Sequence, residues 1–157
     1  MKKILFVCHG NICRSTMAEY VMKDLVKKEG LSDLFFIDSA ATSTEEIGNP
    51  VHPGTRRKLH EMRIACGDHR ARQITRADLA AFDYLLGMDR ANIKNMRRML
   101  GESPKIMQLL DFSSSPRDIA DPWYTGDFDA TFRDVKEGCL SLLYHIVPNI
   151  CKEETNQ

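Results

Sequence analysis

The sequence predicts an α/β fold: a single doubly wound domain of three layers, in which helices cover both faces of a central four-stranded parallel sheet. Two observations lead to this prediction. Short apolar runs alternate with amphipathic helical patterns along the chain, and parallel strands joined by helices are the usual outcome of that alternation. The 157 residues show no repeat, low-complexity tract or linker, so residues 1–157 are expected to form one domain.

The first strand and helix are expected on either side of a short loop. Residues 4–7 form an apolar run that is typical of a buried strand. A helix is expected over about residues 15–29, because apolar side chains recur at every fourth position from Met17 to Leu25 and a glycine follows its end. Ser15 is expected to cap this helix at its N-terminus.

The middle of the chain repeats the same alternation. Residues 34–37 form a second apolar run, which is expected to pair in parallel with the first through a right-handed crossover. Residues 41–53 contain Thr, Ser, Gly and Pro and are expected to form a loop beside the site. Pro53 then opens the next helix. Further helices are expected at about residues 53–62, 76–81 and 90–100, and further strands at 82–86 and 106–110.

The last third of the chain contains an irregular segment and a long helix. Residues 111–126 are rich in Ser, Pro and Asp, and long irregular segments inside compact domains are usually functional or disordered. Residues 127–147 carry one apolar stripe and are expected to form a helix. The polar tail at 152–157 is expected to fray. Ligands of such folds bind at the carboxyl ends of the strands, where Cys8 is expected to lie.

The stretch between the first strand and the first helix has the composition of an anion-binding loop. Cys8 is followed by five residues and then Arg14, with Gly10 and Asn11 between them. The backbone N–H groups of such a loop and the N-terminus of the following helix attract phosphate, and an arginine fork binds two phosphate oxygens at once. The same positive field favours the nucleophilic thiolate of Cys8, although a cysteine taken alone is more often structural. The predicted phosphate loop comprises Cys8, His9, Gly10, Asn11, Ile12, Cys13, Arg14 and Ser15.

Further short motifs accompany this loop. Met17-Ala18-Glu19 follows it after one residue, and the others reach nearly to the end of the chain. Together with the loop they resemble the signature of the low-molecular-weight protein tyrosine phosphatases, because an N-terminal loop of this composition combined with a late Asp-Pro-aromatic motif is a specific combination. The other matching motifs are Asp38-Ser39-Ala40, Gly48-Asn49-Pro50, Ala71-Arg72-Gln73, Met88-Asp89 and Asp121-Pro122-Trp123-Tyr124.

The resemblance implies a cytoplasmic phosphatase that needs neither a metal nor a cofactor. It implies that Cys8 attacks the phosphorus of a phosphotyrosine protein or a small aryl phosphate and forms a phosphocysteine. It also implies that Arg14 clamps the phosphate and that Asp121 is the general acid and then the general base, with inorganic phosphate as the product. From the residues alone, Asp121 could equally be an Asx-turn residue before proline.

Several side chains are expected to support the loop. Asn11 tolerates left-handed backbone geometry, and its side chain can bond across the loop. Ser15 could donate a hydrogen bond to the Cys8 sulfur in addition to capping the helix. The resemblance implies that Ser39 and His69 brace Asn11, although a lone histidine is more often an ordinary surface or core residue.

Two further residues are open to alternative interpretations. Asp89 is expected either to pair with Arg14 or to cap the helix that follows it. Cys13 could form a reversible disulfide with Cys8 under oxidation, which would protect the thiolate. The remaining cysteines, Cys66, Cys139 and Cys151, are expected to be inert.

Three side chains are expected to form the walls of the substrate cleft. Trp123 and Tyr124 are expected to form an aromatic wall, although either could be ordinary core. Glu45 stands where members of the resembled family commonly carry an aromatic residue, which predicts a preference for peptides with neutral or basic flanking residues. Ile12 is typical of the tyrosine phosphatases, whereas relatives acting on phosphoarginine carry a smaller polar residue there.

The composition argues against several other functions. The 22 basic residues are balanced by 22 acidic ones, so neither nucleic-acid binding nor a polybasic membrane anchor is expected. The first apolar run is too short for a signal peptide, and no stretch is long enough to span a bilayer. Five cysteines without a regular spacing are typical of reduced cytoplasmic thiols.

Three rival functions remain at this stage. An arsenate reductase of the same fold would use a nearby relay pair of cysteines, and residues 76–100 contain none. A non-catalytic phosphate-binding module would not need both Cys8 and an acid such as Asp121. A zinc site at Cys8 and Cys13 would need a second Cys/His pair to complete four ligands, and the histidines show no suitable spacing.

Overall fold

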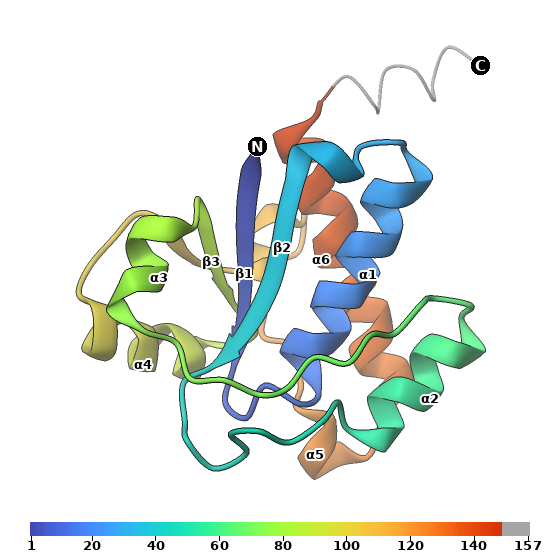
Figure 1. Ribbon diagram of the computed structural model, residues 1–157, viewed down its shortest axis with the longest axis horizontal. Coiled ribbons are helices and arrows are strands. Elements are labelled where there is room, and N and C mark those ends of the chain that lie inside the picture. Colours follow the sequence, from blue (N-terminus) through green and yellow to red (C-terminus); the bar gives the residue numbers. More distant parts are fainter. Residues whose placement is uncertain (149–157) are drawn as a thin grey trace.

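The computed structural model describes residues 1–148 and confirms the predicted α/β fold. Within that range, parallel strands form one sheet in the order β2-β1-β3-β4 (Figure 1). The expectations for the tail at 152–157 and for Cys151 lie outside the described residues. The strands are β1 (Lys2–Cys8), β2 (Phe35–Ala41), β3 (Tyr84–Gly87) and β4 (Ile106–Gln108).

Helices cover both faces of this sheet (Figure 1). One face packs against α1 (Arg14–Lys28), α2 (Pro53–Glu61) and α6 (Phe128–Ile146). The other packs against α3 (Arg76–Ala81) and α4 (Arg90–Leu100). None of the helices within residues 1–148 is both long enough and apolar enough to cross a membrane. The remaining elements are α5 (Pro122–Thr125) and the short 3₁₀ helices η1 (Ser32–Leu34) and η2 (Leu109–Phe112).

The alternating side chains of β1 enter two separate cores. Ile4 and Phe6 pack with α1 and α6, whereas Leu5 and Val7 pack with α4. A strand points successive side chains to opposite faces, and a parallel strand covered on both faces is apolar throughout. Cys8, the last residue of β1, therefore lies at the carboxyl edge of the sheet, where it pairs with the last residue of β2.

The bounds of all four strands differ from those predicted. β1 is longer at both ends, and β3 begins two residues later and ends one residue later than expected. β2 begins one residue later and continues through Ala41, so Asp38-Ser39-Ala40 lies in the strand instead of following it. β4 ends at Gln108, because the Asp111 carboxylate accepts a hydrogen bond from the Gln108 backbone N–H and the chain turns into η2. Local side-chain hydrogen bonds of this kind compete with strand pairing and here outweigh the apolar pattern.

The prediction that Ser15 caps α1 was wrong. The helix begins at Arg14, and its N-cap residue is Cys13, which makes no side-chain capping bond. The Ser15 hydroxyl lies instead 3.0 Å from the Cys8 sulfur. Thr16 donates from its hydroxyl to the carbonyl of Cys13 in this first turn.

Residues 111–126 are more ordered than the sequence suggested. Their last part forms α5, a single turn that starts after Asp121 and ends at Gly126 in a left-handed conformation with φ of 71°. Pro122 occupies the first helical position, where its missing N–H and fixed φ favour a helix start. α5 lies beyond the carboxyl edge of the sheet (Figure 1), and Asp121 and its aromatic neighbours line one pocket with Cys8.

Candidate active site

A tight loop joins β1 to α1 and surrounds the sulfur of Cys8. Cys8 is 3% exposed, and the backbone N–H of Asn11 points at its sulfur over 3.3 Å. Asn11 has a φ of 59°, a left-handed conformation that asparagine tolerates better than most residues. This conformation turns the chain back over the sulfur within a few residues.

The side chain of Asn11 makes all of its hydrogen bonds inside the protein. Its Nδ2 donates to Ser15 Oγ over 2.8 Å and to Ser39 Oγ over 2.9 Å. Its Oδ1 accepts from the Arg72 backbone N–H over 3.2 Å and lies 2.8 Å from His69 Nε2. Ser39 and His69 thus both contact Asn11, as the resemblance implied. An asparagine with every polar atom partnered is held in one orientation.

Ser15 connects the same network to the sulfur. Its Oγ accepts a hydrogen bond from Asn11 Nδ2, so its own proton is free to point at Cys8 Sγ, 3.0 Å away. A hydroxyl donor in this position stabilises a thiolate.

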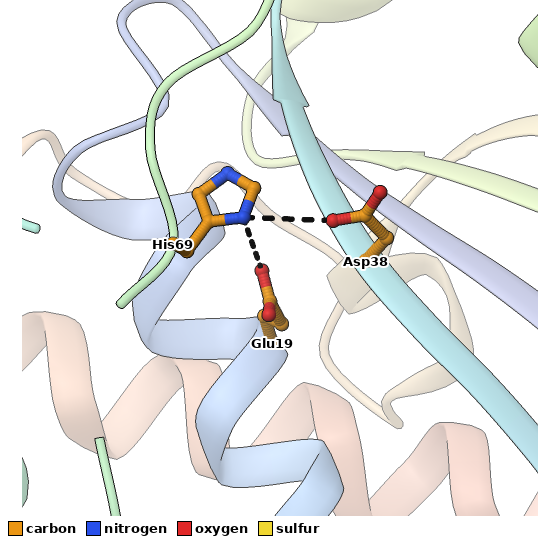
Figure 2. Close-up of side chains that lie close together, drawn as sticks. All are labelled: Glu19, Asp38 and His69. Carbon is orange, nitrogen blue, oxygen red and sulfur yellow. Dashed lines mark ion pairs between the residues drawn. The ribbon is translucent and has the colours of Figure 1, made fainter. Parts of the chain in front are cut away.

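Behind the loop, His69 lies between two carboxylates (Figure 2). Its Nδ1 is 3.4 Å from Glu19 Oε1 and 3.6 Å from Asp38 Oδ1. Among the described residues, these three side chains form the one group of at least three possible metal ligands. Both oxygens already accept hydrogen bonds from Ser39, one from its hydroxyl and one from its backbone N–H. Hydrogen bonding therefore accounts for the cluster as a brace for the loop.

Arg14 is buried between two acidic residues. Its Nη1 donates to Asp89 Oδ2 over 2.7 Å and to the Ile119 carbonyl over 2.9 Å, and its Nη2 lies 3.5 Å from Asp121 Oδ2. Burial by itself would lower the pKa of Arg14, but the negative charge of Cys8 and the two carboxylates outweigh burial and raise that pKa. The guanidinium therefore remains a cation.

Both interpretations of Asp89 hold at once. One carboxylate oxygen binds Arg14, and the other accepts a hydrogen bond from the Asn92 backbone N–H over 2.8 Å and caps α4. The two carboxylate oxygens of Asp121 also have different partners: Oδ1 accepts a hydrogen bond from the Trp123 backbone N–H over 3.0 Å, and Oδ2 faces Arg14. Each carboxylate is fixed at the site by the start of a helix.

Most of the predicted site residues line one pocket. Trp123 and Tyr124 are 57% and 82% exposed, so the alternative that they are ordinary core is wrong. Glu45 lies on the pocket wall, and its Oε2 is 2.9 Å from His9 Nε2. The residues that line the pocket are Cys8, His9, Gly10, Asn11, Ile12, Cys13, Glu45, Glu46, Asp121, Trp123 and Tyr124.

The chain that forms this site is similar to known proteins over most of its length. The sequence pattern of the family described as "Low molecular weight phosphotyrosine protein phosphatase" matches residues 3–155. The chain belongs to that family.

Individual members of the family are similar over almost their whole length. The low molecular weight protein-tyrosine-phosphatase YfkJ of Bacillus subtilis is 43% identical over 150 residues, which cover 93% of this chain and 96% of YfkJ. The low molecular weight phosphotyrosine protein phosphatase of the rat is 43% identical over 148 residues, covering 88% of this chain and 89% of the relative. The crystal structure of YfkJ superimposes with a TM-score of 0.91 and 42% identity, covering 95% of this chain and 96% of that one. Membership of the phosphatase family is thereby confirmed, and arsenate reduction is not favoured.

Cys13 lies in the phosphatase loop but differs from Cys8 in its surroundings. Burial, together with the negative charges of Cys8 and Asp121, raises the pKa of Cys13 to about 12. At neutral pH Cys13 is therefore a thiol and a weak nucleophile. Cys66 is half-buried and Cys139 fully buried, and burial raises the pKa of both thiols.

The site also contains residues that the sequence reasoning missed. Glu46 lines the pocket beside Glu45, close enough to Gly10 that a Cβ added there would lie 3.3 Å from Glu46 Cγ. Glu19 and Arg72 belong to the network behind Asn11, and their places in two of the quoted motifs were the available signal. The hydrogen bond from Arg14 to the Ile119 carbonyl could not be predicted from the sequence, because every residue has a backbone carbonyl.

Proposed function

We propose that this phosphatase hydrolyses phosphotyrosine in proteins and peptides, and small aryl phosphates, through a phosphocysteine intermediate. The observation that carries the proposal is the convergence of three groups: Cys8 and Asp121 line one pocket, and the buried Arg14 places its Nη2 3.5 Å from Asp121 Oδ2. A nucleophile, a proton donor and a fixed cation are the groups that a phosphate monoester needs for cleavage.

In the first step the Cys8 thiolate attacks phosphorus in line with the leaving oxygen. The S–P bond forms while the P–O bond to the phenol breaks, and Asp121 gives its proton to that oxygen. The Arg14 fork and the loop amides bind the equatorial oxygens, where charge accumulates. A bound phosphate dianion would replace the Asp121 carboxylate as a partner of Arg14 Nη2, and two neighbouring negative charges favour a proton between them.

In the second step the Asp121 carboxylate accepts a proton from water as the water oxygen attacks phosphorus. The S–P bond breaks and releases inorganic phosphate, and the Ser15 hydroxyl donates to the departing sulfur. Arg14 and the loop amides supply the charge stabilisation in both steps, so the proposed reaction needs neither a metal nor a cofactor.

The walls of the pocket support a substrate with a flat ring and neutral or basic neighbours. Trp123 and Tyr124 offer an aromatic wall to a phenyl ring. Glu45 and Glu46 carry negative charge on the pocket wall, which disfavours acidic residues beside the phosphotyrosine. Ile12 keeps an apolar surface in the loop, which suits an aryl group better than the guanidinium of phosphoarginine.

We place this activity in the cytoplasm, where the cysteines stay reduced, and expect no nucleic-acid or membrane partner. The basis for both statements is the free thiols and the balanced charge of the chain.

The deciding experiment measures phosphate release from phenyl phosphate and from a phosphotyrosine peptide in the presence of a chelator. Wild type is expected to release phosphate, and a rapid acid quench is expected to trap phosphate on Cys8. Cys8→Ser is expected to lose turnover by about 10³-fold or more. Cys66→Ser is the matched control, because Cys66 lies outside the pocket. Turnover by Cys8→Ser at the wild-type rate, or a phosphoarginine peptide cleaved faster than the phosphotyrosine peptide, would overturn the proposal.

A further inference from the structure

Residues 109–126, the segment that carries Asp121, are attached to α6 along much of their length. At its start, Leu109 packs so closely on Gly138 that a Cβ added to the glycine would lie 2.5 Å from Leu109 Cγ. Near its end, the Thr131 hydroxyl donates to the Ala120 carbonyl over 3.2 Å. Between these points, Phe112 lies against His145 of α6, and the polar side chains of Ser113 and Arg117 bind carboxylates of α6.

Arg117 forms a charged clamp with two carboxylates of α6. Its Nη1 donates to Glu137 Oε2 over 2.9 Å, and its Nη2 donates to Glu137 Oε1 over 3.1 Å. Nη2 also donates to Asp134 Oδ1 over 2.8 Å, and Nη1 to the Ser115 carbonyl over 2.7 Å. Isolated surface ion pairs contribute little, but a bidentate arginine fork within a network is the recognised exception.

Hydrogen bonds from the segment keep the carboxylate of Glu137 charged. The hydrogen bond from Arg117, followed by one from the Ser113 hydroxyl, holds the pKa of Glu137 below its ordinary value. Ser113 therefore attaches a second point of the segment to the same carboxylate of α6. The clamp fixes the backbone on both sides of Ser115.

Only a short stretch of chain separates the clamp from the reacting groups. Ile119 is two residues further on: its N–H donates to the Met88 carbonyl over 2.9 Å, and its own carbonyl accepts from Arg14 over 2.9 Å. Asp121 follows after two more residues and faces Arg14 Nη2. A backbone shift at Arg117 would therefore displace the Ile119 carbonyl and the Asp121 carboxylate, the two groups of this segment that Arg14 binds.

We propose that Arg117 is a positioning residue for phosphoryl transfer, which aligns the Asp121 carboxyl with the leaving oxygen through its clamp on Glu137 and Asp134. The inference rests on the proposed role of Asp121 as the general acid. Arg117 itself does not line the pocket and touches no reacting atom. A general acid acts only within hydrogen-bond reach of the leaving oxygen, so a small displacement costs rate.

The test is the leaving-group dependence of kcat/KM in Arg117→Gln, which removes the charge and the fork. For phenyl phosphate, a poor leaving group, kcat/KM is expected to fall about tenfold, because a misplaced acid loses part of its catalytic factor. For 2,4-dinitrophenyl phosphate, whose leaving group needs no proton, the change is expected to stay within about twofold. The inhibition constant of inorganic phosphate is expected to be unchanged, since the loop is intact.

Two further variants separate positioning from folding. Glu137→Gln is expected to show the same leaving-group pattern in a weaker form, and Arg117→Lys to rescue part of the loss by keeping the charge without the fork. If Arg117→Gln does not fold, Arg117→Lys carries the test by the same ratio of the two substrates. Arg97→Gln is the matched control. Arg97 lies on α4 and outside the pocket, and it forms a surface ion pair with Glu102 over 3.3 Å.

A double-mutant comparison decides the mechanism. In the Asp121→Asn background, Arg117→Gln is expected to have no further effect on phenyl phosphate, because no acid remains to be misplaced. Equal losses on both substrates, or an undiminished effect in the Asp121→Asn background, would overturn the positioning role. A flat leaving-group dependence in Asp121→Asn itself would instead overturn the proposed role of Asp121, so the two failures are distinguishable.

Discussion

The phosphate loop and the segment that carries Asp121 are built in opposite ways. The loop spans only the residues from Cys8 to Ser15, and its backbone contact with the sulfur joins residues three apart. The acid segment is held by residues far away in the chain: the two bonds from Arg14 to Ile119 and Asp121 span 105 and 107 residues. The nucleophile is therefore placed mainly by local geometry, and the proton donor by tertiary contacts.

Arg14 belongs to the loop and also binds the acid segment. Changing it is therefore expected to impair both regions at once and to cause the largest loss of activity. In Arg14→Lys a point charge replaces the fork that binds Asp89, Ile119 and Asp121. We expect kcat/KM on phenyl phosphate to fall by about 10²- to 10³-fold, with weaker inhibition by phosphate. Arg97→Lys serves as the control, and a loss below about threefold in Arg14→Lys would contradict the assignment.

The next largest effect is expected from removing the proton donor alone. Asp121→Asn should lower kcat/KM on phenyl phosphate by about 10²-fold and leave phosphate inhibition almost unchanged. The loop does not depend on Asp121, so only steps that need a proton should slow. Steady-state rates on aryl phosphates of graded acidity measure this. Asp33→Asn in η1, outside the pocket, is the control, and an unchanged rate in Asp121→Asn would remove the acid from the mechanism.

A change inside the loop should weaken phosphate binding and slow good and poor leaving groups equally, which is the opposite of the effect expected for Asp121→Asn. Asn11→Ala removes a side chain that contacts Ser15, Ser39, His69 and Arg72 and puts alanine into a left-handed conformation. Phosphate affinity and kcat/KM are expected to fall about tenfold, equally for good and poor leaving groups. Inhibition constants and a leaving-group series measure both quantities. If the rate of Asn11→Ala depends more steeply on the leaving group than the wild-type rate does, the loop also influences proton donation, and the contrast between the two regions is wrong.

The smallest effect is expected from Asp78 of α3, whose carboxylate accepts hydrogen bonds from the guanidinium of Arg72 behind the loop. Burial would raise the pKa of Asp78, but the hydrogen bonds from Arg72 and Thr75 outweigh it and lower the pKa below 3.8. The unfolded state therefore takes up this proton at a higher pH than the folded state does, so stability from this pair is present above about pH 4 and is lost as the pH falls through the folded pKa.

This pH dependence is measurable by urea unfolding. We expect Asp78→Asn to lower the free energy of unfolding by about 1–2 kcal/mol at pH 7 and by less near the acid end of the titration. Asp33→Asn provides the exposed comparison. A destabilisation that grows as the pH falls would show that the sign is wrong.

Much of the fold followed from patterns that act over a few residues. The apolar run at 4–7 and the helical spacing from Met17 onward predicted the unit that places Cys8 at the carboxyl edge of the sheet. Two of the boundaries that differ do so for local polar reasons: Asp111 ends β4 early, and Ser15 contacts the sulfur instead of capping α1. β2 differs for a non-local reason, because it pairs with β1 as far as Ala41. The apolar pattern does not register either hydrogen bond.

The sequence by itself determined that a cysteine, a glycine, an asparagine and an arginine would share one anion-binding loop, because backbone geometry couples residues that close in the chain. The family resemblance named Asp121 as the acid, but only the tertiary structure decided how an acid so far along the chain reaches that loop. It brought Asp121 to Arg14 and attached its segment to α6 through Arg117. The physical reason is that charged groups about a hundred residues apart meet only after the helices have packed on the sheet, and no local pattern records which of them will meet.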